Sequence, residues 1–377
     1  DGAKDSRTGA YKLTDYELEA RLTSAFWKSS PDVEGLAVAA SGTLKTPAGL
    51  KAEIKRILDS PKARDTMWNF YYQWLGVSRL PINGYSSGAG FDAFASPYTA
   101  AQLNNSFRDA VMKDGRQYLE YLTFTQPSNL EALFRSPLIF TTDATVASIY
   151  GVSARANDTA PPVTDAGGHY NGLLTRQFLT QQKPSNNGDI NHILRGVFLM
   201  TNIIGKELGL PANFADQQQA GIAIPSSAST RFEVNAKTGI GSCISCHSSI
   251  NPAGYALGNY DSLGRYITME KRFRPDNGGT LVATNAVDAT TALFLNGKSY
   301  QISDTKTLTD ALFTSGVVYQ GFANYYFQYV FGRAPVSGPD QQLLEELKQN
   351  LKTKTIREAL QALGESALFS LAQTADL

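Results

Sequence analysis

The chain has 377 residues and a mass of 40.9 kDa, which is long for one hydrophobic core and predicts two or three structural units. Its 34 basic residues balance its 34 acidic residues, so no overall charge favours nucleic acid or an anionic membrane as a partner. No apolar stretch is long enough to predict a transmembrane segment, and the two cysteines of the chain lie only three positions apart.

Residues 1–150 are predicted to form an N-terminal helical domain. Thr14 and Glu17 have the spacing of a capping box, in which each side chain hydrogen-bonds a backbone amide at the start of a helix. The apolar periodicity predicts further helices over residues 50–58, 67–74 and 99–122.

Residues 151–240 are predicted to be a loop-rich middle segment with one buried helix. Pro, Gly, Asn and Thr are frequent in much of this segment, whereas residues 190–204 are apolar almost all round. His192 and Arg195 lie three positions apart in this helix and therefore share one face. Because a buried guanidinium needs an acceptor, we expect Arg195 to have a dedicated partner.

Residues 241–377 contain the most specific motif of the chain, Cys243-Ile-Ser-Cys246-His247. Cys-x-x-Cys-His is the attachment signature of a c-type haem. Residues three and four apart share one face of a helix, so both cysteines can reach the haem vinyl groups as thioethers while His247 ligates the iron. A zinc site would need four ligands in a closed set, and a thioredoxin-like dithiol would predict a βαβ context that is not found here. The motif therefore predicts one covalent haem c.

The rest of the C-terminal domain is predicted to combine helices with one small β-hairpin. The hairpin is expected within residues 275–302, where alternating runs flank glycine-containing turns. Helices are expected from about residue 307, over the aromatic residues 322–331, and after a second capping box at Thr355 and Glu358. The expected fold is mainly α and multi-helical, with a C-terminal c-type haem region in 241–377 and one small β-hairpin.

The segment that follows the motif carries a family resemblance. The run Asn251-Pro-Ala-Gly-Tyr-Ala-Leu-Gly-Asn-Tyr-Asp-Ser-Leu-Gly-Arg265 resembles one that is typical of large exported cytochrome-like proteins from planctomycetes and proteobacteria, which are built from serial domains of unknown function. Shorter similar stretches occur from residue 11 to residue 333. The chain departs from the pattern at Asn251, where Asp is usual, at Gly258, where Glu is usual, and at His192, where Pro is commoner. The resemblance implies an exported protein with a single c-type haem, and it supplies no substrate.

The ligand on the other side of the iron is the main open question of the sequence. His192 is the first choice, because the chain has only three histidines and this one lies on a buried helix beside Arg195. Met269, just beyond the haem segment, is the second choice, and His169 and Met200 are further alternatives. A histidine or methionine in this position would give a low-spin electron carrier.

Arg195 and Arg265 are the candidate residues for contacts with the haem itself. A haem propionate would satisfy a buried Arg195, although an acidic side chain would serve as well. Arg265 is a candidate because it ends the run that resembles the family.

The function expected from these residues is electron transfer with a redox protein or a small-molecule donor or acceptor. His192 as distal base and Arg195 as charge stabiliser would instead suit a peroxidase-like or oxygen-activating haem enzyme. A third alternative is a structural or surface-assembly protein in which the haem mainly stabilises the fold. Thioether attachment is made outside the cytoplasm, so a periplasmic, extracellular or cell-surface location is expected. The sequence identifies neither the redox partner nor the oligomeric state.

Overall fold

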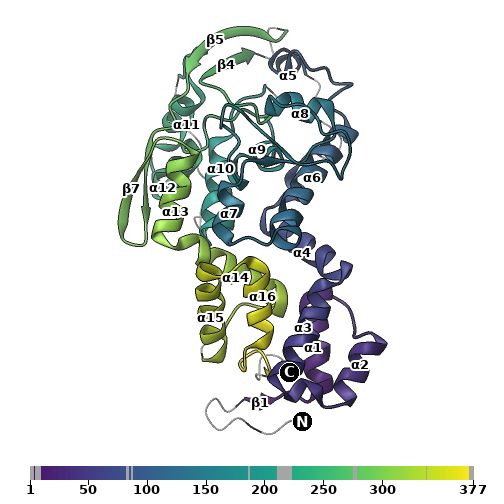
Figure 1. Ribbon diagram of the computed structural model, residues 1–377. Helices are drawn as coiled ribbons and strands as arrows, with labels where there is room; N and C mark the ends of the chain where they lie inside the picture. Colours follow the sequence, from purple (N-terminus) through teal and green to yellow (C-terminus); the bar gives the residue numbers. More distant parts are fainter. Residues whose placement is uncertain are drawn as a thin grey trace. The chain divides into compact units, whose positions relative to one another are not determined.

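The computed structural model describes residues 4, 10–81, 85, 88–185, 187–209, 223–274, 278–336 and 338–372. Within these residues the fold is mainly α-helical with small two-stranded antiparallel sheets, which confirms the predicted class (Figure 1). Packing divides the chain into two units that do not follow chain order. The first comprises Asp1–Trp74, Leu119–Leu130 and Tyr319–Leu377, and the second comprises Leu75–Tyr118 and Glu131–Val318. None of the helices described combines the length and apolar character that a bilayer-spanning helix needs.

The first unit is built from helices near both ends of the chain. They are α1 (Asp15–Trp27), α2 (Val33–Ala40), α3 (Pro47–Asp59), α4 (Pro61–Trp74), most of α14 (Val317–Phe331), α15 (Pro339–Thr353) and α16 (Ile356–Glu365), with short helical turns at Thr43–Lys45 and Tyr121–Thr125. The capping boxes predicted at Thr14 and Thr355 are both present, at the starts of α1 and α16. Strand β1 (Tyr11–Lys12) pairs antiparallel with β8 (Leu371–Ala372).

Aromatic side chains from α4 and α14 fill the core of the first unit. The ring of Phe70 lies 5.2 Å from that of Phe322 and 4.9 Å from that of Tyr326, both in edge-to-face contacts. Trp74 is fully buried, and its ring lies 5.1 Å from that of Phe322. Such aromatic pairs add roughly 0.5–1.5 kcal/mol each to the energy of burial. The apolar stripes predicted over residues 67–74 and 322–331 therefore pack against each other.

One carboxyl group in the first unit is buried without a compensating hydrogen bond. Glu19 on α1 is completely buried, and neither carboxylate oxygen has a hydrogen-bond partner among the described residues. Arg56 lies 3.9 Å away, but its guanidinium binds Glu53 at 2.5 Å and Asp32 at 2.9 Å. Burial, followed by the charge of Glu53, raises the pKa of Glu19 to about 7.

The raised pKa of Glu19 makes the stability of the chain depend on pH. A carboxyl group whose pKa is higher in the folded state stabilises that state below its unfolded pKa, and the contribution is lost as the pH rises through 7. The loss is about 3 kcal/mol, at 1.4 kcal/mol per pKa unit. We therefore expect Glu19→Gln to be more stable than the wild type at pH 8 and to show a flatter dependence of the free energy of unfolding between pH 5 and 8, as measured by urea denaturation.

Glu34→Gln is the matched control for this measurement. Glu34 also lies within 3.6 Å of Arg56, but its side chain is 69% exposed. This variant should keep the slope of the wild type. Equal slopes in the wild type and Glu19→Gln would contradict the assignment to Glu19.

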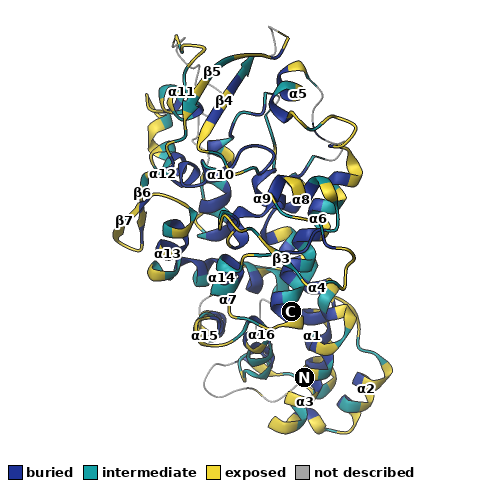
Figure 2. Ribbon diagram, turned by 45° about the horizontal axis from the view of Figure 1, so that its top comes forward, coloured by how far each residue is buried: buried dark blue, intermediate teal, exposed yellow. Residues whose placement is uncertain are grey.

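The second unit combines short helices, long loops and small sheets. Its helices are α5 (Ala89–Ala95), most of α6 (Asn105–Glu120), α7 (Leu130–Arg135), α8 (Ala144–Tyr150), α9 (Gln177–Thr180), α10 (His192–Phe198), α11 (Thr230–Thr238), α12 (Cys243–Tyr255) and α13 (Thr305–Ser315), with helical turns at Val77–Arg79, Leu173–Thr175 and Leu199–Ile203. Its strand pairs are β2 (Leu138–Ile139) with β3 (Val163–Thr164), β4 (Met269–Arg274) with β5 (Thr280–Ala286), and β6 (Thr291–Leu295) with β7 (Lys298–Ile302). Helices α9 and α10 are mostly buried (Figure 2).

The structure has two hairpins where the sequence predicts one within residues 275–302, and the first strand of the first hairpin precedes that range. Strands β4 and β5 form the first, and β6 and β7 form the second. Strand β4 lacks an apolar alternation because its buried positions hold Glu270 and Arg272. Arg272 is held at 2.6 Å by Glu233 on α11. Charged residues with ion-pair partners occupy the buried positions of this strand. The sequence therefore shows no alternation of apolar and polar residues here, and the strand is not predicted.

Buried arginines organise the loops of the second unit. The guanidinium of Arg176 is fully buried and donates to the carbonyl oxygens of Leu138, Ser136 and Tyr170 at 2.6–3.2 Å. Arg155 similarly donates to the carbonyl oxygen of Phe140 at 2.7 Å. Each guanidinium donates to several backbone carbonyl oxygens, which links irregular segments of the buried chain.

Candidate functional site

The Cys-x-x-Cys-His motif forms the start of helix α12. Cys243 is the first helical residue, and Cys246 and His247 follow it at i+3 and i+4, so all three side chains lie on one face. Each is partly exposed, and the two cysteines are not joined in a disulfide. The predicted arrangement of two thiols and one imidazole on a single helical face is therefore present.

His247 is held by a side chain one turn further along α12. Its Nδ1 lies 2.9 Å from Oδ1 of Asn251, which is 5% exposed. Asn251 in turn donates from Nδ2 to Oγ1 of Thr238 on α11 at 2.7 Å. In the part of the chain that the structure describes, Nε2 of His247 makes no hydrogen bond. A histidine held at Nδ1 with Nε2 available has the donor arrangement of an iron ligand.

Helix α12 is fixed against α10 through two glycines. A β-carbon added at Gly196 would overlap the carbonyl oxygen of Ile250, and one added at Gly254 would overlap that of His192. His192 thus lies beside Gly254, and Gly196 beside Ile250, so the two helices run antiparallel. The absence of both side chains lets the backbones approach closely and anchors the helix that carries the motif.

Comparisons with known families match two parts of the chain. Residues 13–152 match PSD4, a protein family of unknown function (DUF1592), and residues 170–270 match PSCyt3, a protein family of unknown function (DUF1588). The chain carries a DUF1592 and a DUF1588 domain in series. No curated protein and no solved structure matches it. The DUF1588 match contains all site residues proposed from the sequence except His169, which directly precedes it.

His192 is the first residue of α10 in the DUF1588 domain and belongs to a buried hydrogen-bond network. It is 3% exposed, with Nδ1 3.4 Å from the carbonyl oxygen of Gly254 and Nε2 3.0 Å from Oγ1 of Thr230. Thr230 donates to Glu270 at 2.6 Å. Burial, followed by the charge of Arg195, lowers the pKa of His192 to about 3, so the imidazole is neutral at physiological pH.

The structure does not bring His192 and His247 together. His192 contacts α12 at Gly254, which lies seven residues and about 10 Å along the helix from His247. Both ring nitrogens of His192 already lie within hydrogen-bonding distance of other atoms. Iron ligation by His192 stays a prediction, and it would require the Nε2 contact with Thr230 to break.

The remaining candidate iron ligands, Met269, His169 and Met200, lie at three different places in the second unit. Met269 is the first residue of β4 and is 49% exposed, beside a cavity of about 480 Å³ that Arg265 and Tyr266 also line. The ring of His169 stacks on that of Tyr266 at 3.9 Å. Met200 is buried and lines a separate cavity of about 320 Å³ together with residues 248 and 249 of α12, which directly follow His247.

The described partners of the Arg195 guanidinium are backbone carbonyl oxygens, and its contact with a haem propionate stays a prediction. Its guanidinium donates to the carbonyl oxygens of Leu257, Tyr260, Thr180 and Asp261, at 2.8–3.0 Å for all but Tyr260. These acceptors lie on α9 and on the loop after α12. Arg195 therefore ties three segments of the DUF1588 domain together, and a carbonyl acceptor has no side-chain signature that a sequence pattern could reveal.

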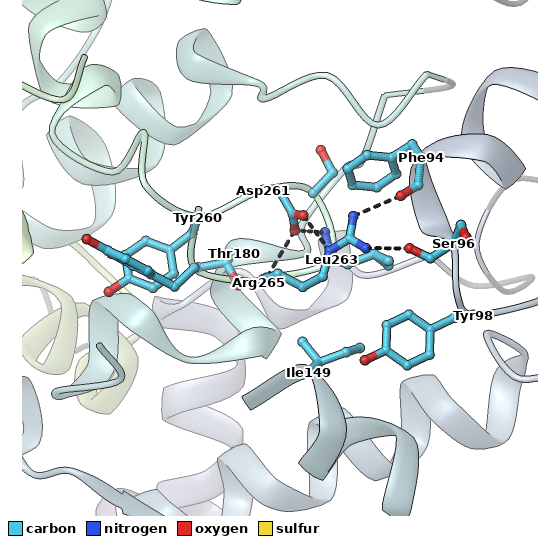
Figure 3. A network of polar contacts seen from close by, with 12 residues as sticks. Phe94, Ser96, Tyr98, Ile149, Thr180, Tyr260, Asp261, Leu263 and Arg265 are labelled. Atoms are coloured by element: carbon cyan, nitrogen blue, oxygen red, sulfur yellow. Dashed lines mark hydrogen bonds and ion pairs between the residues drawn. The ribbon is translucent and has the colours of Figure 1, made fainter. Parts of the chain in front are cut away.

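Arg265 is engaged in a similar way (Figure 3). It forms an ion pair with Asp261 at 2.6 Å and donates to the carbonyl oxygens of Phe94 and Ser96 at 2.9 and 3.1 Å. The carboxylate of Asp261 also accepts from the backbone amide of Leu263 at 2.8 Å. At the end of the family-like run, Asp261 therefore binds Arg265, and Arg265 holds the C-terminal end of α5. Contact of Arg265 with haem stays a prediction.

Proposed function

We propose that this chain is an exported monohaem c-type cytochrome that acts in electron transfer. The observation that carries the proposal is the start of α12, where Cys243, Cys246 and His247 share one face and His247 is held at Nδ1. The name of the matched family, PSCyt3, agrees with a cytochrome-like domain. Export follows from the proposed attachment, because thioethers to haem are made outside the cytoplasm.

The residues at the start of α12 fit this cofactor. The thiols of Cys243 and Cys246 are one helical turn apart and would bind the two vinyl groups, while His247 would present Nε2 to the iron. A haem held there supplies reversible one-electron chemistry at its iron. The contact of α10 with α12 through Gly196 and Gly254 holds the helix in place, which favours a small structural change on electron gain and loss.

Covalent attachment is the first test of the proposal. We expect the protein, produced by export in a host that makes c-type cytochromes, to keep its haem after acid denaturation and extraction with an organic solvent, because thioether bonds survive this treatment. The double variant Cys243→Ala, Cys246→Ala should lose the covalent haem completely, whereas Ser249→Ala on the same helix should keep it. Haem that leaves with the solvent, or a disulfide between the cysteines in place of haem, would overturn the proposal.

A second readout from the same preparation separates a carrier from an enzyme. The electron-transfer proposal predicts a six-coordinate, low-spin ferric spectrum, with a reversible midpoint potential and no rapid reaction with peroxide or cyanide. A high-spin ferric iron that binds cyanide or peroxide rapidly would contradict the carrier function and would favour a haem enzyme. Substitution of His192 and then of Met269 by alanine would identify the distal ligand by conversion to high spin.

A further inference from the structure

A chain of hydrogen bonds connects His247 to the last turn of α11. The hydroxyl of Thr238 donates to the carbonyl oxygen of Val234 at 2.7 Å. The same hydroxyl oxygen accepts from Nδ2 of Asn251 at 2.7 Å, and Oδ1 of Asn251 lies 2.9 Å from Nδ1 of His247. Thr238 and Asn251 are both 5% exposed, so water has little access to replace these contacts.

The direction of each bond in this chain follows from the first one. A hydroxyl has a single hydrogen, and that of Thr238 is committed to Val234, so toward Asn251 the hydroxyl can only accept. The amide group of Asn251 therefore turns its NH₂ to Thr238 and its carbonyl oxygen to His247. Since a carbonyl oxygen only accepts, Nδ1 of His247 must carry the proton. The lone pair of the neutral imidazole then lies on Nε2.

We propose that Asn251 is a positioning residue that holds His247 in the Nδ1–H tautomer and, as an uncharged acceptor, raises the reduction potential of the haem above the value that a carboxylate in its place would give. The proposal rests on the proposed function, because it concerns the iron ligated by His247. The chemical type of the residue at position 251 would then control how much electron density the imidazole of His247 donates to the iron.

The physical reason lies in the difference between an amide and a carboxylate. A carboxylate attracts the Nδ1 proton strongly, gives the imidazole partial imidazolate character and stabilises the ferric iron. The amide of Asn251 accepts the same hydrogen bond without a negative charge, so the ferric state gains less. Asn251 has a second function that a carboxylate would lose, since only the amide can donate to Thr238 without the threonine hydroxyl leaving Val234.

The test compares the midpoint potentials of four variants of the complete haem-loaded protein. Asn251→Asp should lower the potential, and Asn251→Leu, which removes the acceptor, should raise it. Thr238→Val leaves the amide unanchored and should shift the potential in the same direction as Asn251→Leu, by a smaller amount. Ser249→Ala, on the same helix but outside the hydrogen-bond chain, should leave the potential unchanged.

A second readout follows the Nδ1 proton itself. In the ferric protein this proton should appear as a hyperfine-shifted, slowly exchanging NMR signal, and its exchange with solvent should become faster in Thr238→Val and faster still in Asn251→Leu. Covalently attached haem whose potential is the same in the wild type, Asn251→Asp and Asn251→Leu would overturn this inference and leave the proposed function intact. Absence of covalent haem from the wild type would overturn the proposed function instead.

Discussion

Arg195→Met should destabilise the protein by at least about 4 kcal/mol, or prevent its accumulation. The guanidinium of Arg195 is almost fully buried and donates to four carbonyl oxygens, on α9 and on the loop after α12. A methionine of similar length fills the space but leaves these acceptors without donors, at about 1–3 kcal/mol for each one that stays buried. Denaturant unfolding followed by circular dichroism measures the difference.

Arg195→Lys separates the geometry of the guanidinium from its charge. A lysine keeps the positive charge, but its compact ammonium has only three donors and cannot span four acceptors on separate segments. We expect it to lose most of the stability that methionine loses. Full rescue by lysine would show that Arg195 acts as a charge, as a partner for a propionate would, and would contradict its function as a donor to the backbone.

Gly254→Ala has the second largest expected effect, a loss of about 3 kcal/mol in the free energy of unfolding. At an open helical position alanine is more stable than glycine by up to about 1 kcal/mol. At Gly254 the added β-carbon would overlap the carbonyl oxygen of His192, so α10 and α12 must separate. The same displacement should lower the yield of protein with attached haem, as read from the ratio of haem absorbance to protein.

Gly88→Ala is the control for this substitution. Its backbone φ is negative, and no atom lies within 4 Å of the β-carbon position, so we expect no loss of stability. A melting temperature of Gly254→Ala equal to or above that of the wild type would show that the two helices tolerate the separation. The anchoring of α12 by close backbone approach would then be wrong.

Local chemistry in the sequence predicted the helical parts of the fold well. Thr14 and Thr355 each precede a glutamate by three positions, and both form the expected capping boxes, because such a box depends only on residues within one turn. The apolar helix predicted over 190–204 is present as α10 and the helical turn that follows it. The motif at Cys243 lies at the start of a helix although its N-cap residue, Ser242, makes no side-chain capping hydrogen bond.

Contacts between residues far apart in the sequence could not be predicted from local patterns. The acceptors of Arg195 are backbone carbonyls, which every residue carries, so nothing in the sequence distinguishes them. The close helix contact at Gly196 appears only once α10 meets α12. Asn251 did carry a usable signal, because it lies four positions after His247 and so shares its face, but only the structure shows that its amide reaches Nδ1.

The pairing of β1 with β8 has a consequence for the order in which the protein can be assembled. The first unit needs Tyr319–Leu377, whereas all segments of the second unit precede residue 319. If the chain is exported as proposed, with its N-terminus leading, the complete second unit with Cys243 and Cys246 leaves the channel before β8, the partner strand of β1. On the proposed function, we therefore expect haem attachment to take place on a partly folded protein, in which the first unit is completed only afterwards.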